Sequence, residues 1–256
     1  SALGYMRMGE YFGARNDWER AAAEYEEAVK RDPGQDVLFA SLVQIYARQR
    51  KFGPAVAACE ARVRRNPKDA FAWHLMGQMY AGQGDPRKAE EAFRKAMDAD
   101  PENLLNYQSL ARLYASGKDY PRAVQVYEQA LAKRPDFWPA ANDLAAILSD
   151  QGKTKGDLDR ALSLAQGALK KRPGEGVVQD TVGWVYYRRG ENRQALEYLQ
   201  GAHAKLPDNP EVNYHLGMAL VRDGKKQEAK GHLQEALARK DDFPGREEAA
   251  KTLAGI

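Results

Sequence analysis

The sequence predicts an all-helical protein in which one pair of helices is repeated about seven times along the chain. Three observations predict this fold class. Prolines recur at a regular interval, alanines and glycines recur in register with them, and no stretch alternates apolar and polar residues as strands do. Repetition at this length indicates a stacked array, in which each repeat buries its apolar faces against its neighbours.

Six prolines, here called the register prolines, set the register of the repeat. They stand at equal intervals, except that the step from the fourth to the fifth is four residues longer: Pro33, Pro67, Pro101, Pro135, Pro173 and Pro207. An alanine stands at one fixed distance before each of them, as Ala21 does before Pro33, and Ala229 continues the series. Alanine also recurs at a second, shorter distance, as Ala28 does, with Arg62 as the one departure. These small residues are expected where the two helices of a repeat approach one another most closely.

The stretch AWHLMGQMYAGQG predicts a helix that carries Gly77 in the middle of its apolar stripe. A glycine inside a helix costs about 1 kcal/mol relative to alanine. We expect Gly77 to lie against Ala89 of the following helix, so that close packing of the two backbones offsets this cost. The side chains of Trp73, Tyr80 and Phe93 are then expected to fill the space around the contact.

The register resembles that of the tetratricopeptide repeat, a helix–turn–helix unit of about 34 residues, over nearly the whole chain. The third repeat fills all eight signature positions, with Trp73, Met76, Gly77, Tyr80, Ala89, Phe93, Ala96 and Pro101. The second repeat departs at Val43, Cys59 and Arg62, and the seventh has Asp241 in place of the proline. The resemblance implies an all-α, right-handed α-solenoid superhelix that forms a single domain. Its expected repeats are residues 2–35, 36–69, 70–103, 104–137, 138–175, 176–209 and 210–243, with a capping helix at about 245–254.

The fifth repeat holds four extra residues within the stretch 148–162. We expect this insertion to lengthen the turn between the two helices, or to extend the first helix by a turn. A functional role and neutral drift both remain open for it. The triplet Gly152–Lys153–Thr154 does not make a phosphate loop, because Ile147 stands where that motif requires a glycine and no strand precedes it.

Composition and spacing exclude several classes of function. The 39 basic and 36 acidic residues are mixed along the chain, without the clustered basic face of a nucleic-acid binder. No apolar run is long enough for direct membrane insertion. Cys59, the only cysteine, replaces an aromatic core position and is expected to be an inert packed thiol. The four histidines lack metal-binding spacing, and no pair of carboxylates is isolated in an apolar setting. Together with the packed thiol, these observations lead us to expect no metal site, no cofactor and no catalytic residue, and hence no enzyme.

The compartment stays open between cytoplasm and periplasm. The sequence begins in helical rhythm and without a signal peptide, so we expect a fragment whose upstream targeting information is missing. A single cysteine does not separate the two compartments, because exported helical proteins also occur without disulfides.

The resemblance also implies where a partner would bind, because the first helices of tetratricopeptide repeats line a concave groove. In the N-terminal half, the groove positions carry Gln44, Gln78 and Arg112. In the C-terminal half, they carry Asn142, Asp143, Asp180, Trp184, Tyr187, Arg188, Tyr214, His215, Met218 and Arg222. The repeat signature does not require the aromatic residues and methionine in this second set, and exposed aromatics beside arginine are typical of binding hot spots. In the alternative interpretation, these side chains pack against neighbouring first helices.

We therefore expect a non-catalytic protein–protein interaction scaffold that binds a peptide or a helix of a partner in this groove. The stretch from Asp180 to Leu220 is also similar to bacterial envelope proteins with tetratricopeptide repeats that are linked to exopolysaccharide or protein export. Two alternatives stay open. The chain could be the recognition arm of a larger enzyme such as a glycosyltransferase, or a structural scaffold that self-associates through its end helices.

Overall fold

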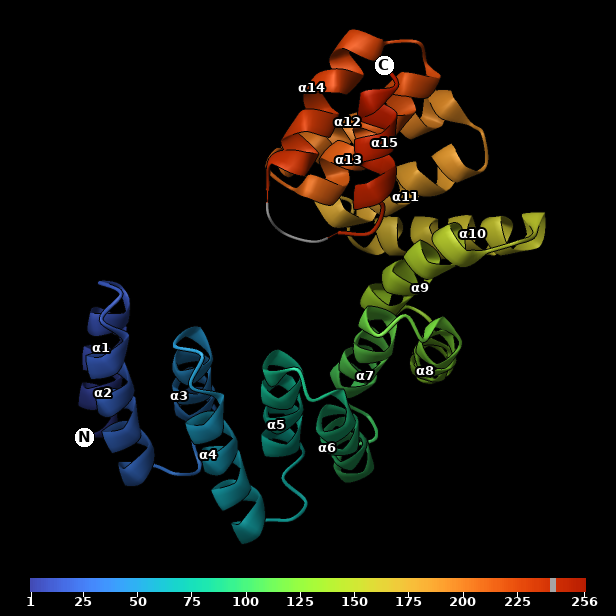
Figure 1. Ribbon diagram of the computed structural model, residues 1–256. Helices are drawn as coiled ribbons and strands as arrows, with labels where there is room; N and C mark the ends of the chain where they lie inside the picture. Colours follow the sequence, from blue (N-terminus) through green and yellow to red (C-terminus); the bar gives the residue numbers. More distant parts are fainter. Residues whose placement is uncertain (240–242) are drawn as a thin grey trace. The chain divides into compact units, whose positions relative to one another are not determined.

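The computed structural model describes residues 1–239 and 243–256, and all regular structure within these ranges is α-helical (Figure 1). The first helices of the pairs are α1 (Ala2–Gly13), α3 (Asp36–Arg48), α5 (Ala70–Gln83), α7 (Leu104–Ser116), α9 (Trp138–Gln151), α11 (Gly176–Arg188) and α13 (Pro210–Arg222). The second helices are α2 (Trp18–Arg31), α4 (Phe52–Arg65), α6 (Pro86–Ala99), α8 (Tyr120–Lys133), α10 (Lys155–Lys171), α12 (Asn192–Lys205) and α14 (Lys226–Ala238). A last helix, α15 (Arg246–Ala254), follows the seventh pair. The predicted fold class is confirmed, while the expectation for Asp241 falls outside the described residues.

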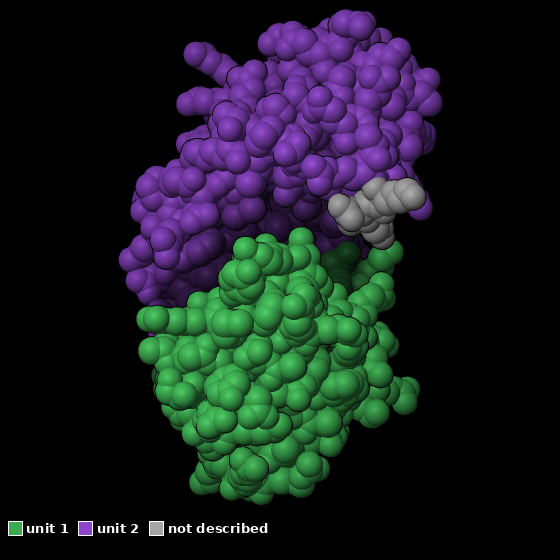
Figure 2. Space-filling view, turned by 90° about the vertical axis from the view of Figure 1, so that its left-hand side faces the viewer, with its two compact units in different colours: residues 1–126 green, residues 127–256 purple. Residues whose placement is uncertain are grey.

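The chain divides into two compact units, which Figure 2 shows in different colours. Unit 1 comprises Ser1–Val126 and contains α1 to α7 with the beginning of α8. Unit 2 comprises Tyr127–Ile256 and contains the rest of α8 and all later helices. The single domain expected from the sequence stays a prediction. None of the helices in the described ranges is both long and apolar enough to cross a membrane.

Proline sets the helix ends as the sequence predicts. The second helices that precede a register proline each end two residues before it, as α2 does at Arg31 before Pro33. The reason is that proline lacks a backbone N–H and disfavours the helical conformation in the residue before it. Proline also begins a helix, since Pro210 is the first residue of α13. The Oδ1 atom of Asn209 accepts hydrogen bonds from the backbone N–H groups of Glu211 and Val212, at 2.9 and 3.1 Å, and so caps this helix.

Three of the four extra residues of the fifth repeat lie in its second helix, since α10 has 17 residues and α8 has 14. The fourth lies in α9, which has 14 residues against 13 in α7, so neither a longer turn nor a first helix extended by a full turn is found. The other second helices that precede a register proline all begin at the same distance from it, and the equivalent position before Pro173 is Leu158. Helix α10 begins earlier, at Lys155. The cause is a capping box. The hydroxyl of Thr154 accepts a hydrogen bond from the N–H of Asp157 at 3.2 Å, and the Asp157 carboxylate accepts one from the N–H of Thr154 at 2.9 Å.

Glycine in the middle of a first helix makes room for one large side chain of the second helix. A Cβ added to Gly77 would lie 2.6 Å from the ring of Phe93, so even a methyl group does not fit there. The atoms nearest to that Cβ position belong to Phe93, one of the side chains expected around the contact, while the close approach of Gly77 to Ala89 stays a prediction. The same positions of other repeats form the same kind of pair, namely Gly9 with Tyr25, Gly183 with Leu199 and Gly217 with Leu233.

The second repeat fills the same space with the sizes exchanged. Val43 takes the glycine position, and Cys59 takes the position of the large side chain, which is equivalent to Phe93 in the third repeat. Both side chains are fully buried and belong to one core cluster. Burial raises the pKa of the Cys59 thiol to about 12, so the side chain is a packed thiol, as the sequence predicts.

Arg62, the other departure in the second repeat, ties two helix starts together. Its Nε atom donates a hydrogen bond to the carboxylate of Asp69 at 2.6 Å, and an Nη atom donates to the carboxylate of Asp36. Asp36 begins α3, and Asp69 caps α5 by accepting a hydrogen bond from the N–H of Ala72 at 2.9 Å. An alanine at this position would leave both carboxylates without the guanidinium.

Candidate partner-binding site

The predicted groove residues of unit 2 lie on three first helices, α9, α11 and α13. Helix α11 contacts both α9 and α13, and Figure 1 shows where the three helices lie in the chain. This packing gathers an aromatic stack around Trp184 of α11. It also gathers carboxylates from all three helices, namely Asp150 of α9, Asp180 of α11 and Glu211 of α13.

The aromatic stack runs through four side chains of α11 and α13. The ring of Trp184 stacks on Tyr187 with 4.7 Å between centroids, and on His215 with 4.0 Å. The guanidinium of Arg222 lies 3.5 Å from the centroid of the Tyr187 ring, at the far end of the stack. Tyr214 contacts Trp184 in a tilted arrangement, at 5.4 Å. These contacts fix the position of α13 against α11 through ring packing and a cation–π interaction.

The expectation that these aromatic side chains lie exposed in a groove is wrong. Only 5% of Trp184 and 2% of Tyr214 is accessible, and Tyr187, His215 and Met218 are buried as well. The alternative interpretation, packing against a neighbouring first helix, holds for the Trp184 and His215 pair.

The C-terminal segment covers Tyr214. The ring of Phe243 lies 5.8 Å from that of Tyr214, and the Tyr214 hydroxyl donates a hydrogen bond to Glu248 of α15 at 2.7 Å. Gly245 makes this approach available, because a Cβ there would lie 2.3 Å from the Tyr214 ring. Its φ of +88° also falls in the left-handed region, which suits glycine. The capping helix therefore seals the end of the aromatic cluster.

Two carboxylates hold the stack from its edges. Asp150 accepts hydrogen bonds from Nε1 of Trp184 at 2.7 Å and from the guanidinium of Arg188 at 3.3 Å. Asp180 accepts from Nδ1 of His215, with 2.9 and 3.1 Å to its two oxygens. Burial on its own lowers the pKa of His215. The carboxylates of Asp180, Glu211 and Asp150 outweigh this effect and raise the pKa, which favours the charged imidazolium.

Glu211 is the third carboxylate of this group, and unlike Asp150 and Asp180 it takes no part in the hydrogen bonds around the stack. Among the residues that the structure describes, no hydrogen bond or ion pair holds its side chain, although the residue is half-buried. Burial raises the pKa of Glu211, the His215 ring partly counteracts this, and Asp180 and Asp150 raise the pKa further. A desolvated carboxylate beside two others is stabilised by an added positive charge. The geometry therefore suits a cationic group at Glu211.

The remaining predicted residues separate by exposure. Asn142 is buried, and Asp143 is half-buried with a hydrogen bond from the Tyr127 hydroxyl at 3.1 Å. Arg188 and Arg222 are exposed at the border of the stack. The residues predicted in unit 1 are exposed on its first helices: Gln44, Gln78 and Arg112.

Sequence reasoning missed Glu211 as a candidate. It occupies the second position of the seventh repeat, one of the family's groove positions, so its place in the register was the available signal. The sequence could not show that Glu211 lacks a hydrogen bond or ion pair. That depends on which carboxylates the neighbouring side chains bind, and Trp184 binds Asp150 while His215 binds Asp180.

Comparisons with known proteins agree with the helix pairs. One family description, tetratricopeptide repeat, matches the chain through two models, one over residues 80–148 and 186–255 and the other over 6–70 and 41–103. No curated protein matched the chain.

Solved structures of similar fold are also found. A tetratricopeptide repeat protein from Parabacteroides merdae is 16% identical with a TM-score of 0.70, and the match covers 99% of this chain and 98% of that one. A chain of the APC/C hetero-tetramer Cut9–Hcn1 is 17% identical with a TM-score of 0.73, covering 99% of this chain and 48% of that one. MamA from Desulfovibrio magneticus RS-1 is 20% identical with a TM-score of 0.54, covering 66% of this chain and 93% of that one.

At these identities, the solved structures show the shared fold alone. The family matches extend over more than half of the chain. The chain belongs to the tetratricopeptide repeat family.

Proposed function

We propose that the protein is a non-catalytic scaffold whose first-helix face on unit 2 binds a peptide or a helix of a partner protein. Arrays of this family generally serve as protein–protein interaction modules, which supports the general class. The observation that carries the specific proposal is the half-buried Glu211 carboxylate, which makes no hydrogen bond or ion pair among the described residues. A lysine or arginine side chain of the partner supplies the missing positive charge.

The buried aromatic residues take a supporting role in this proposal. Trp184 and His215 hold Asp150 and Asp180 in place through hydrogen bonds. The negative charges of these two carboxylates act on Glu211 and raise its pKa. Arg188 and Arg222 stay proposed contacts that are exposed, and Asp143 stays a proposed contact that is half-buried. Gln44, Gln78 and Arg112 stay proposed contacts on the first helices of unit 1.

Selection from a random peptide display library, with the whole chain as the target, tests this proposal. We expect the selected peptides to share a lysine or arginine. We expect Glu211→Gln to weaken their binding by about tenfold or more, because the salt bridge loses its charge in a partly desolvated place. Glu197→Gln is the matched control, since Glu197 is exposed on the second helix α12.

Three results would contradict the proposal. They are the absence of any binding peptide from repeated selections on folded protein, selected peptides without a shared basic residue, and equal affinity of the Glu211→Gln and Glu197→Gln variants. Isothermal titration calorimetry with a synthetic version of each selected peptide gives the affinities.

A further inference from the structure

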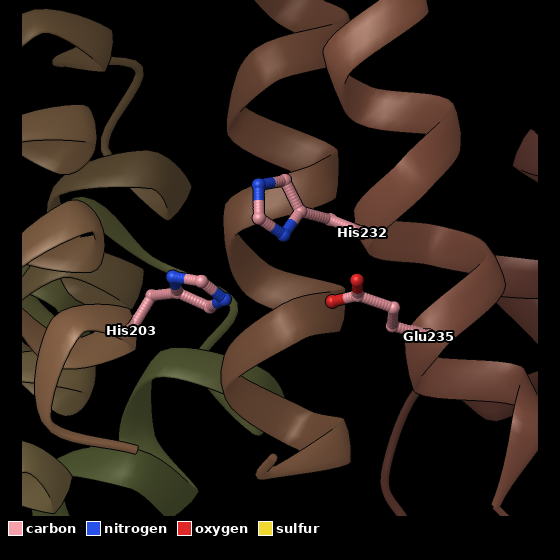
Figure 3. Close-up of side chains that lie close together, drawn as sticks. All are labelled: His203, His232 and Glu235. Carbon is pink, nitrogen blue, oxygen red and sulfur yellow. The ribbon is translucent and has the colours of Figure 1, made fainter. Parts of the chain in front are cut away.

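Three side chains with metal-ligand chemistry meet between two second helices of unit 2. His203 lies near the end of α12, while His232 and Glu235 lie about one turn apart on α14. Figure 3 shows the three side chains turned toward a common point. One donor atom from each lies within 4.8 Å of the donor atoms of the other two. Within the described ranges, no further group of three histidine, cysteine or acidic residues meets this spacing.

The two imidazoles are already packed against each other. Their ring centroids are 4.7 Å apart with the planes at 82°, and both residues are half-buried. In Figure 3, His232 turns the nitrogen next to its side-chain stem, Nδ1, toward the Glu235 carboxylate. Glu235 is exposed, so its carboxylate can move toward the two rings without repacking of the core.

Asn213 of α13 adds a fourth donor that is held in orientation. Its Oδ1 atom lies 2.9 Å from Nδ1 of His232. Its amide nitrogen donates to the carbonyl oxygens of Pro207 at 2.6 Å and Asn209 at 3.1 Å. These two bonds fix which way the amide points, so the oxygen faces His232, and Asn213 is only 2% exposed. A cation that replaces the proton on Nδ1 would therefore meet a buried carbonyl oxygen already aimed at it.

The set of donors selects a class of ion. Two imidazole nitrogens with one carboxylate and one amide oxygen suit a divalent first-row transition ion, zinc above all, while calcium and magnesium prefer oxygen alone. Nitrogen and carboxylate oxygen ligands of a tetrahedral zinc lie about 2.0–2.2 Å from the ion. The donors therefore have to close in from their present separation, and the exposed Glu235 side chain supplies the freedom to do so.

We propose that His203, His232 and Glu235, with the side-chain oxygen of Asn213, form a binding site for one zinc-type divalent ion. The ion joins α12, α13 and α14 and so fastens the last two repeats to each other. This site is built on second helices and on the buried amide of Asn213, so it does not depend on the peptide site around Glu211.

Titration of tag-free, metal-depleted protein with Zn²⁺ in a calorimeter tests the site. We expect one ion per chain and a rise of the melting temperature on binding. His203→Gln and His232→Gln should each weaken binding by about tenfold or more, and Glu235→Gln should weaken it to a smaller extent. Titration with Co²⁺ should give the intense visible absorption of a four-coordinate ion in the wild type, and lose it in His232→Gln.

Matched controls separate the site from adventitious binding. His74→Gln removes a histidine from unit 1, and Glu228→Gln removes an exposed carboxylate from α14, so both variants should bind Zn²⁺ as the wild type does. Far-UV circular dichroism confirms folding, and Glu235→Gln keeps the test decisive if a histidine variant unfolds. No saturable binding at micromolar Zn²⁺ would overturn the proposal. So would binding that all three site variants retain at wild-type affinity.

Discussion

The indole of Trp184 stacks on the imidazole of His215, with ring centroids 4.0 Å apart and planes within 16° of parallel. Each ring is also hydrogen-bonded to a carboxylate, Trp184 to Asp150 and His215 to Asp180. Neighbouring first helices of unit 2 are therefore joined by one structure that is both aromatic and charged. A change at Trp184 should affect packing and electrostatics together.

Trp184→Ala should lower the free energy of unfolding by about 3–5 kcal/mol, because it removes a large buried ring and leaves a cavity. Trp184→Phe keeps a ring but loses the hydrogen bond to Asp150, so a smaller loss of about 1–2 kcal/mol is expected. Urea denaturation followed by far-UV circular dichroism measures both. A loss below about 1 kcal/mol for the alanine variant would show that the stack is not a stabilising core element.

In the second repeat, a small residue at position 43 and a large one at position 59 should be tolerated only when both positions are substituted together. Cys59→Phe alone overpacks the buried cluster around Val43 and should cost about 1–3 kcal/mol. Val43→Gly alone leaves a cavity and lowers helix propensity, which together cost about 2–3 kcal/mol. The double variant recreates the Gly77 and Phe93 arrangement of the third repeat and should recover part of both losses.

A double-mutant cycle by chemical denaturation measures this coupling. Additive losses in the double variant would mean that the two side chains do not share a space. The comparison is a second double variant, in which Val43→Gly is combined with Ala55→Phe instead of Cys59→Phe. Ala55 is buried in the same cluster, but its position in the repeat is equivalent to Ala89 and not to Phe93.

His74 should make the stability of unit 1 depend on pH. Burial lowers the pKa of His74 below its usual 6.5, and the hydrogen bond with Asn106 offsets this in part. As the pH falls, the unfolded chain therefore takes up a proton on His74 before the folded chain does. The contribution of the neutral ring to the free energy of unfolding is complete above pH 6.5 and is lost as the pH falls through the lower pKa of the folded state.

The stability difference between wild type and His74→Gln, measured by denaturation from pH 8 to pH 5, isolates this effect from the other histidines. The wild type should lose more stability than the variant as the pH falls. Parallel curves would show that the ring does not titrate abnormally.

Glu211→Gln should raise the stability of the free protein at neutral pH. Burial, with Asp180 and Asp150 nearby, raises the pKa of Glu211 above its usual 4.5. Stability linked to this group is therefore present below pH 4.5 and is lost as the pH rises through the folded pKa. At pH 7 the neutral amide should add up to about 1 kcal/mol to the unfolding free energy. Thermal and urea denaturation at several pH values check the gain, which Glu197→Gln should not show.

The succession of helix pairs could be predicted from sequence because its signals are local. Proline stops a helix by its own covalent structure, and so the ends of α2 and α12 follow from Pro33 and Pro207. The contact at Gly77 was harder to predict in detail. Phe93 belongs to the repeat signature, but the direction in which its ring points, and so its approach to the glycine, depends on packing in three dimensions.

The candidate sites were less predictable, since they depend on contacts between elements distant in the sequence. Register placed Trp184 and Tyr214 at groove positions, but their burial follows from contacts with His215 and with α15. His203 and His232 showed no metal-binding spacing along one helix, because the donors come from successive second helices. The resemblance to bacterial envelope proteins also stays a prediction.

The second repeat has Val43 and Cys59 at the two positions where the third repeat has Gly77 and Phe93, and this difference has a consequence for how such arrays evolve. A substitution at only one of the two positions leaves a cavity or overpacks the core, so accepted substitutions should occur at both positions together. Related arrays should therefore show correlated substitutions between these positions inside a repeat, with little correlation from one repeat to the next.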